Sequence, residues 1–261
     1  MRWSIGVAGS PISHSVTPAL HEEGLRIANL QGTSERVELA REDAAQLSTL
    51  LGDRFDALSI TMPLKFVAVE YCDALDEVAS RTGSVNSMLV RDGQVLGAST
   101  DGRGFLDALA GELTFDVAGA QVVVLGAGGA ARAIIDALVA ADVSSVTVFG
   151  RTPGNVDFLT GLYGNVHDVW ASSSPVDLIV NTVPAEGRPD EAVLVEGVAP
   201  DTVAVDITYV PALSTWLALH EQVGCRTQNG LAMLAYQAAL QMRWWWWDVE
   251  IDGASLLRAI S

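Results

Sequence analysis

The stretch Gln121-Val-Val-Val-Leu-Gly-Ala-Gly-Gly-Ala-Ala-Arg132 decides the fold of this 261-residue chain. Its first five residues predict a buried strand, and the glycine-rich turn after them leads into a helix that ends near residue 141. Gly126 permits a tight turn, Gly128 lets the main chain approach a pyrophosphate, and Ala131 is small enough for helix and strand to pack closely. The helix start also offers unpaired N–H groups to an anion. The stretch therefore predicts a Rossmann-type dinucleotide-binding unit; the alternative is a glycine-rich turn without a ligand.

The end of the next strand indicates which dinucleotide is bound. That strand, predicted at residues 146–149, runs into Gly150-Arg151-Thr152, where there is no carboxylate. A carboxylate there would hold the ribose 2′-hydroxyl of NAD, whereas a basic side chain accommodates the 2′-phosphate of NADP. NADP is therefore favoured over NAD, although Arg151 taken alone is also compatible with a solvated surface arginine.

Strands and helices alternate on both sides of this stretch, which predicts an α/β fold with mostly parallel sheets. Before it we expect a hairpin that turns at Asp92-Gly93, a strong turn dipeptide, and a helix at residues 102–113. The other strands are expected at residues 3–8, 36–39, 55–60, 145–149, 176–180 and 202–206, with helices at 17–25, at 42–51 and from about 231. These elements place the domain boundaries near residues 100–104 and 228–230.

Composition excludes several classes of function. The chain has 32 acidic residues against 14 arginines and a single lysine, Lys65, giving a net charge of −17. Such a charge repels nucleic acid and anionic membrane surfaces, so neither is an expected partner. The sequence shows no apolar run long enough to span a membrane, and residues 1–10 lack the pattern of a cleavable leader, so we expect a cytoplasmic protein. Cys72, Cys225 and the scattered histidines lack metal-ligand spacing, so we predict buried thiols and no metal site.

Several polar side chains stand where loops meet strands or helices. Ser15 and Thr17 lead into the first helix, where two hydroxyls can bind a carboxylate, although either residue could instead be an N-cap. Lys65 follows a strand end and a proline turn. Asn86 and Asp101 occupy later loops, and Gln237 lies on the last long helix.

Seven segments, taken in order, resemble the shikimate dehydrogenase family. They are SHSVTP at residues 13–18, TMPLK at 61–65, SVNS at 84–87, STD at 99–101, GAGGAAR at 126–132, GRT at 150–152 and NGLAMLAYQAA at 229–239. The resemblance covers the chain from about residue 6 to 247. It implies an α/β substrate domain at residues 1–101 completed by residues 230–261, a Rossmann domain for NADP at 102–229, and a cleft between them.

The resemblance also implies roles for individual residues. Lys65 and Asp101 would be catalytic and face the hydroxyl that is oxidised. Substrate binding is implied for Ser15 and Thr17 at the carboxylate, for Thr61, Asn86 and Gln237 at the ring hydroxyls, and for Tyr209 near the carboxylate. Cofactor binding is implied for Gly126, Ala127, Gly128, Gly129, Ala130, Arg151, Thr152, Thr182, Gly230 and Met233, and residues 181–187 match the family segment N-T-T-P-x-G.

The expected function is an NADP-dependent alcohol dehydrogenase that interconverts shikimate and 3-dehydroshikimate in aromatic amino acid biosynthesis. A lysine beside a carboxylate forms a coupled pair that can take and relay the hydroxyl proton, while the cofactor takes the hydride. No metal is needed. The expected partner is a small molecule, and the protein is expected to be a monomer or a homodimer.

Three departures from the family pattern keep alternatives open. The family's Ser-x-Ser is Ser15-x-Thr17, its Asn before Thr-Asp is Ser99, and its Asn-Arg-Thr begins with Gly150, with Asn155 where a second basic residue is usual. The alternatives are a quinate/shikimate or aminoshikimate dehydrogenase, a dinucleotide-binding regulatory module without turnover, and an enzyme like methylenetetrahydrofolate dehydrogenase. The four consecutive tryptophans at 244–247 cannot all face one core of a helix, so we expect at least one to be exposed.

Overall fold

The computed structural model describes residues 2–169, 175–184, 197–247 and 249–260, which form two compact units. The first unit comprises Met1–Ala108 and Leu234–Ser261, and the second comprises Leu109–Met233. Both boundaries fall inside helices, α4 (Asp101–Leu113) and α8 (Leu231–Trp245). Within the described ranges, no helix is long and apolar enough to cross a membrane.

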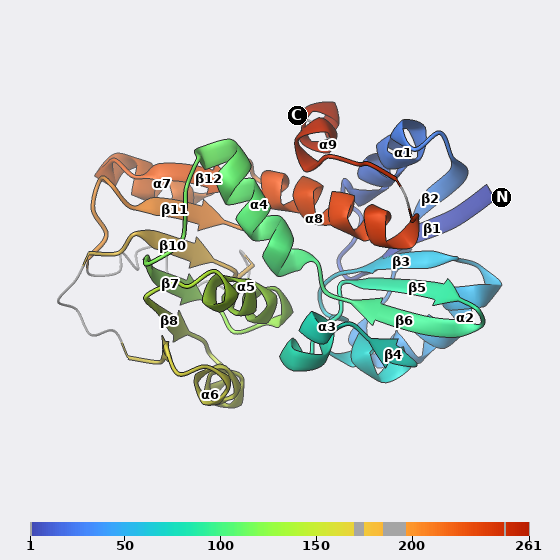
Figure 1. The fold of residues 1–261 in the computed structure, drawn as a ribbon, viewed down its shortest axis with the longest axis horizontal. Helices are drawn as coiled ribbons and strands as arrows, with labels where there is room; N and C mark the ends of the chain where they lie inside the picture. Colours follow the sequence, from blue (N-terminus) through green and yellow to red (C-terminus); the bar gives the residue numbers. More distant parts are fainter. Residues whose placement is uncertain (1, 170–174, 185–196, 248, 261) are drawn as a thin grey trace. The chain divides into compact units, whose positions relative to one another are not determined.

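The described part of the first unit is built on a sheet with the strand order β2-β1-β3-β5-β6-β4 (Figure 1). Its strands are β1 (Arg2–Gly9), β2 (Gln31–Glu38), β3 (Ala57–Ile60), β4 (Ala74–Leu75), β5 (Ser87–Arg91) and β6 (Gln94–Ala98). β1 pairs in parallel with β2 and β3, and β4 pairs in parallel with β6. β5 pairs antiparallel with β3 and β6, so the sheet is mixed. The antiparallel pairings arise from the predicted hairpin, whose turn residues Asp92 and Gly93 both have positive φ angles.

Alternating side chains give this sheet two apolar faces. On one face, residues such as Ala57 pack with α1 (Thr17–Ile27), α8 and α9 (Gly253–Ile260), which lie along that side in Figure 1. On the other face, Leu58 and Ile60 pack with η1 (Arg41–Gln46), α2 (Leu47–Asp53) and η2 (Val67–Tyr71), and with Ala79 of α3 (Glu77–Thr82). Ser59 lies between Leu58 and Ile60 on β3, so its hydroxyl belongs to the α1 and α8 face.

The second unit is the Rossmann-type unit that the sequence predicts. Its described strands are all parallel, in the order β12-β11-β10-β7-β8-β9, which is the strand order of doubly wound dinucleotide-binding folds. They are β7 (Gln121–Leu125), β8 (Ser145–Phe149), β9 (Val166–His167), β10 (Leu178–Asn181), β11 (Val203–Asp206) and β12 (Arg226–Asn229). The helix α5 (Gly129–Ala140) joins β7 to β8, α6 (Pro153–Leu162) joins β8 to β9, and α7 (Thr215–Val223) joins β11 to β12.

Some local expectations differ from the structure. The helix expected at residues 42–51 is instead the 3-10 turn η1 followed by α2, which is interrupted at Leu51 and Gly52, where Gly52 has a φ of 90°. The short strands β9 and β12 were not expected, because an edge strand such as Arg226-Thr-Gln-Asn229 lacks the apolar run of a buried strand. Cys72 is only half-buried, whereas Cys225 is buried as predicted, and both thiols are free.

The tryptophan run is divided between the core and solvent. Trp245 and Trp246 are buried in the core beneath α8, Trp244 is half-buried, and Trp247 is exposed. Arg91 lies over the Trp247 ring, with 4.5 Å between its guanidinium carbon and the ring centroid. The expectation that the four rings cannot share one core is confirmed.

Candidate active site

Chain topology brings the predicted substrate residues of the first unit to one edge of its sheet. β1 and β3 are parallel neighbours, so the loops after them, which carry Ser15 and Lys65, leave the same edge. β5 is antiparallel to β3, so Asn86, just before β5, lies at that edge, where Ile60 N donates to Asn86 O at 2.7 Å. Asp101 reaches the same edge, because β6 ends there and Asn86 N donates to Ala98 O at 3.0 Å.

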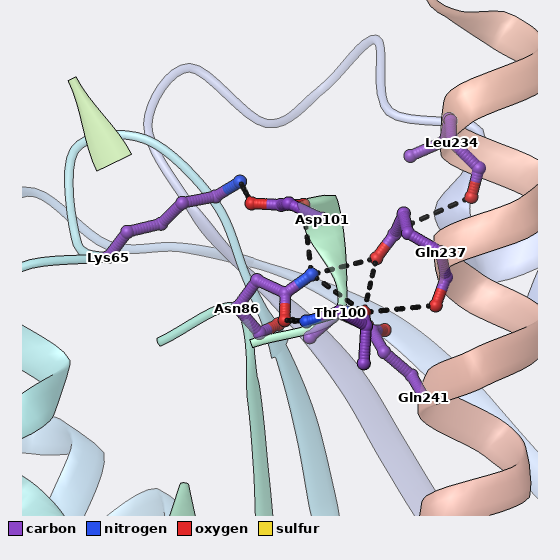
Figure 2. Close-up of polar contacts among 8 residues, drawn as sticks. Lys65, Asn86, Thr100, Asp101, Leu234, Gln237 and Gln241 are labelled. Carbon is purple, nitrogen blue, oxygen red and sulfur yellow. Dashed lines mark hydrogen bonds and ion pairs between the residues drawn. The ribbon is translucent and has the colours of Figure 1, made fainter. Parts of the chain in front are cut away.

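Lys65 and Asp101 form an ion pair at this edge. Lys65 Nζ lies 2.5 Å from Asp101 Oδ2, and the two side chains are 16% and 5% exposed (Figure 2). Asp101 is the first residue of α4, where the helix dipole stabilises a carboxylate. The pair therefore places an amine that can exchange a proton next to a fixed negative charge.

Asn86 is locked in one orientation beside this pair. Its Oδ1 accepts from Thr100 N at 2.8 Å, and a main-chain N–H can only donate, so the other end of the carboxamide must be nitrogen. That nitrogen, Nδ2, lies 2.9 Å from Asp101 Oδ1 and 3.0 Å from Gln237 Oε1. Asn86 therefore holds the second oxygen of Asp101 while Lys65 holds the first.

Gln237 joins the cluster from α8, more than 130 residues further along the chain. Its Nε2 donates to Leu234 O at 2.9 Å, which fixes Oε1 toward Asn86. Thr100 Oγ1 lies 3.1 Å from Gln237 O and 2.9 Å from Asn86 Nδ2. Figure 2 shows Asn86, Asp101 and Gln237 converging beside the helix that carries Gln237.

Ser15, Thr17 and Thr61 lie at the same sheet edge. Ser15 and Thr17 are buried, and Ser15 Oγ accepts from Thr17 N at 3.3 Å. The N-cap of α1 is Val16, without a side-chain cap hydrogen bond, so neither hydroxyl residue is the N-cap itself. The loop after β1 contacts the segment that begins with Thr61, since Ser10 N donates to Met62 O at 2.9 Å.

The glycine loop of the second unit has the features that a pyrophosphate requires. Gly126 has a φ of 108°, and a Cβ there would come within 2.1 Å of Thr182 Oγ1, which itself donates to Leu125 O at 2.8 Å. Gly128 is the N-cap of α5, and a Cβ there would meet nothing within 4 Å. Exposed N–H groups at a helix start with open space above them fit the phosphates of a dinucleotide. Ala127, Gly129 and Ala130 complete this loop.

The remaining predicted cofactor residues lie elsewhere in the second unit. Arg151 and Thr152 are exposed after β8, and Thr152 is the N-cap of α6. Nearby, Arg132 Nη2 donates to Asn155 Oδ1 at 3.0 Å, and burial lowers the pKa of the Arg132 guanidinium.

Three further predicted residues follow the strands β11 and β12. Gly230 has a structural reason to be glycine, since a Cβ would lie 1.9 Å from Ile207 O. Met233 is buried and Tyr209 is half-buried. In the segment matched at residues 181–187, residues 185–187 lie outside the described part of the chain.

The structure adds residues to the site that the sequence did not single out. Thr100 bonds Asn86 and Gln237, and Gln241 Nε2 donates to Asn86 O at 2.9 Å. Gln241 is four residues after Gln237 on α8, a spacing that places both on one helix face and could have indicated it. Over the described ranges, no group of three or more His, Cys, Asp or Glu side chains is placed to hold a metal ion.

Comparisons with known proteins agree with this architecture. Residues 7–88 match the family model described as the shikimate dehydrogenase substrate binding domain. Residues 108–181 match the family model described as shikimate/quinate 5-dehydrogenase. Together the two matches cover more than half of the chain.

Individual relatives match along nearly the full length. Shikimate dehydrogenase (NADP(+)) of an Exiguobacterium species is 34% identical, over 93% of this chain and 92% of that protein. The crystal structure of shikimate 5-dehydrogenase from Thermus thermophilus in complex with NADP(H) and shikimate is 31% identical, has a TM-score of 0.83 and covers 98% of each chain. The crystal structure of an Ael1 enzyme from Pseudomonas putida is 25% identical, has a TM-score of 0.83, and covers 99% of this chain and 98% of that one.

Proposed function

Because the chain belongs to the shikimate dehydrogenase family of NAD(P)-dependent oxidoreductases, we propose that it interconverts shikimate and 3-dehydroshikimate with NADP. This reaction belongs to aromatic amino acid biosynthesis. The observation that carries the proposal is the ion pair of Lys65 with Asp101, at 2.5 Å. Asn86 Nδ2 donates to Asp101 Oδ1 and also to Gln237 Oε1. In this proposal residues 1–101 and 230–261 bind the substrate, and residues 102–229 bind the dinucleotide.

The pair supplies the acid and base that the reaction needs. Oxidation of a secondary alcohol breaks its C–H bond with the electron pair, so a hydride and the hydroxyl proton must both leave. NADP, when bound, supplies the hydride acceptor. Lys65, as the neutral amine, takes the proton at Nζ, and Asp101 stabilises the ammonium that forms. In the reduction direction the ammonium returns that proton to the new alkoxide, with the pair acting as one coupled unit.

Neighbouring side chains are suited to orient a polyhydroxylated ring acid. Asn86, Thr61 and Gln237 offer amide and hydroxyl groups for ring hydroxyls next to the catalytic pair. Ser15 and Thr17, with Tyr209, would hold the ring carboxylate through neutral donors. Holding the ring at several points brings one hydroxyl to Lys65, which lowers the entropic part of the barrier.

The preference for NADP rests on the second unit. The open start of α5 at Gly128 suits the pyrophosphate, and Arg151 after β8 offers a cation for the 2′-phosphate. Thr152, Thr182, Gly230 and Met233 complete the proposed cofactor site, with Gly126, Ala127, Gly129 and Ala130. The relative from Exiguobacterium carries NADP(+) in its name, which supports the same choice.

Two alternatives remain within this family, a quinate/shikimate and an aminoshikimate dehydrogenase. Thr17 in place of serine supports the first, because the family resemblance links this form to tolerance of quinate as well as shikimate. A regulatory module without turnover is less favoured, because Lys65 and Asp101 are both present and paired.

One steady-state experiment tests the proposal. Shikimate, quinate and aminoshikimate are each offered with NADP and with NAD, and formation of the reduced cofactor is followed by absorbance. We expect kcat/KM to be highest for shikimate with NADP. Faster oxidation of quinate or aminoshikimate would assign the alternative substrate. No oxidation of any of the three, by folded protein at high concentration, would overturn the dehydrogenase proposal.

A further inference from the structure

A row of buried polar side chains lies behind the catalytic cluster, between α1, β3 and α8. His21 is fully buried, and Ser59 and Gln241 are 5% and 1% exposed. Ser34 Oγ lies 2.8 Å from His21 Nδ1, and His21 Nε2 lies 3.0 Å from Ser59 Oγ. Ser59 Oγ then lies 2.6 Å from Gln241 Oε1, and Gln241 Nε2 lies 2.9 Å from Asn86 O.

Every hydrogen bond in this row has one permitted direction. Asn86 O can only accept, so the Gln241 atom facing it is the amide nitrogen, and Gln241 Oε1 accepts from the Ser59 hydroxyl. Ser59 has one hydroxyl hydrogen, which that bond uses, so His21 must donate its Nε2–H to Ser59 Oγ. His21 Nδ1 is then an acceptor for the Ser34 hydroxyl. The hydrogen bonds therefore all run in one direction: Ser34 donates to His21, His21 to Ser59, Ser59 to Gln241 and Gln241 to Asn86 O.

The histidine at the centre of the row is held neutral. Burial lowers the pKa of His21 from 6.5 to about 3, so the ring carries one hydrogen at neutral pH. The Trp245 ring packs edge-on against it, with centroids 5.2 Å apart, and Trp245 Nε1 donates to Ser87 Oγ at 2.8 Å. The tautomer with hydrogen on Nε2 is the one the row requires.

The row ends on the residue that holds the catalytic pair. Asn86 O accepts from Ile60 N in the sheet and from Gln241 Nε2, while its side chain bonds Asp101 and Gln237. Gln237 and Gln241 are one turn apart on α8. Gln237 therefore bonds the carboxamide of Asn86 while Gln241, on the same helix, bonds its main-chain carbonyl. A shift of this carbonyl would turn the carboxamide away from Asp101.

We propose that Gln241 is a positioning residue for the reaction. It is oriented by His21 and Ser59, and it fixes the Asn86 main chain so that the Asn86 carboxamide stays between Asp101 and Gln237. The inference rests on the proposed function, in which Asn86 binds the substrate. Gln241 does not touch the reacting atoms; it acts through Asn86.

A double-mutant cycle tests this assignment. Gln241→Met keeps the length of the side chain and removes both hydrogen bonds. We expect it to lower kcat/KM for shikimate roughly 5- to 10-fold, the effect of about one buried hydrogen bond, with the KM for NADP unchanged. In an Asn86→Ala background the same change should alter kcat/KM by less than about 2-fold, since coupled residues are not additive. If Gln241→Met lowered kcat/KM by the same factor with and without Asn86→Ala, the proposal would be overturned.

Two further variants separate positioning from general destabilisation. Leu256→Ala shortens a fully buried side chain of α9 that packs in the same core but is not part of the row, and we expect it to lower stability without lowering kcat/KM. Ser59→Ala removes the hydroxyl that orients Gln241, so it should lower kcat/KM by a smaller factor than Gln241→Met does. In the Asn86→Ala background, Ser59→Ala should no longer lower kcat/KM. If Leu256→Ala lowered kcat/KM as much as Gln241→Met does, the effect of Gln241→Met would be merely structural.

A spectroscopic readout keeps the inference separate from the choice of substrate. If the wild type oxidises no shikimate, the proposed function fails, but the hydrogen-bond row can still be measured by ¹⁵N NMR. We expect His21 protonated at Nε2 alone, and Asn86 side-chain amide protons that exchange slowly in the wild type and faster in Gln241→Met. A His21 ring protonated at Nδ1, or unchanged Asn86 exchange in that variant, would contradict the inference.

Discussion

Lys65 Nζ lies 2.5 Å from Asp101 Oδ2, although the two residues stand 36 positions apart and belong to different connections of the sheet. Lys65 follows β3 through a proline turn, and Asp101 opens α4. With side chains only 16% and 5% exposed, the pair is poorly screened by solvent. Removing either partner leaves an uncompensated charge in a nearly buried position, which is costly. The single lysine of the chain is therefore held at the Asp101 carboxylate by a hydrogen bond as well as by opposite charge.

Substitution of Lys65 distinguishes charge from proton transfer. Lys65→Met removes the amine and should lower kcat by roughly 10² to 10⁴, the range expected for losing a general acid or base. Lys65→Arg keeps the positive charge, but guanidinium is effectively never deprotonated, so most of the rate should also be lost. The measurement is steady-state kcat with shikimate and NADP, beside circular dichroism for folding. Turnover near that of the wild type in Lys65→Arg would mean that the lysine serves position rather than proton transfer.

The sequence predicts those parts of this molecule in which one local pattern determines the structure. Gln121–Leu125 and the loop at Gly126 fall where expected, because a continuous apolar run and a glycine turn leave few alternatives. The helix expected at 42–51 is divided into the 3-10 helix η1 and α2, and α2 is interrupted at Leu51 and Gly52. The strand β12 was not predicted, because its edge position tolerates polar residues. The pattern of apolar residues within one segment does not indicate which strand that segment will pair with, and β12 forms by pairing with β11.

For the candidate site, the ordered motifs of a family resemblance supplied what composition could not. Lys65, Asn86, Asp101 and Gln237 were grouped by that resemblance, and the structure brings these four together. The sequence gives His21 no role beyond that of one of four scattered histidines. Its hydrogen-bond partners, Ser34 and Ser59, lie on other elements of the fold. Its role depends on contacts across the sheet, which sequence spacing does not give.

Two glycines of the same loop should respond differently to alanine. Gly126→Ala places a Cβ 2.1 Å from Thr182 Oγ1 at a φ of 108°, so we expect it to lower the free energy of unfolding by about 2 kcal/mol or more. Gly128→Ala meets nothing within 4 Å and should change that free energy by no more than about 1 kcal/mol. If a pyrophosphate occupies the open space, Gly128→Ala should still raise the dissociation constant for NADP.

Urea unfolding and NADP titration by intrinsic fluorescence measure both effects. The pair serves as its own control, because both changes add one methyl group within three residues. Unchanged NADP affinity in a stable Gly128→Ala protein would remove this loop from the proposed cofactor site.

The preference for NADP over NAD should depend on Arg151. Arg151→Ala should raise the KM for NADP roughly 10-fold, the loss of one charge-assisted hydrogen bond, while the KM for NAD changes little. Arg103→Ala is a matched control, since it removes another exposed arginine and shifts the net charge of −17 equally. Equal rises in both KM values, or an equal effect of Arg103→Ala, would show that Arg151 acts only through the overall charge.

Acid should destabilise the protein through His21. Its pKa is about 3 in the folded state and 6.5 when unfolded, so between these values the unfolded chain binds more protons. Stability must therefore fall as the pH drops below 6.5, by up to about 1.4 kcal/mol per pH unit from this group. His21→Gln stays neutral, so its free energy of unfolding should lack this part of the pH dependence. Urea unfolding of both proteins at about pH 7 and about pH 5 measures it. We expect the wild type to lose more stability than the variant over this interval; a constant difference between them would show that His21 is not neutral and buried as the structure has it.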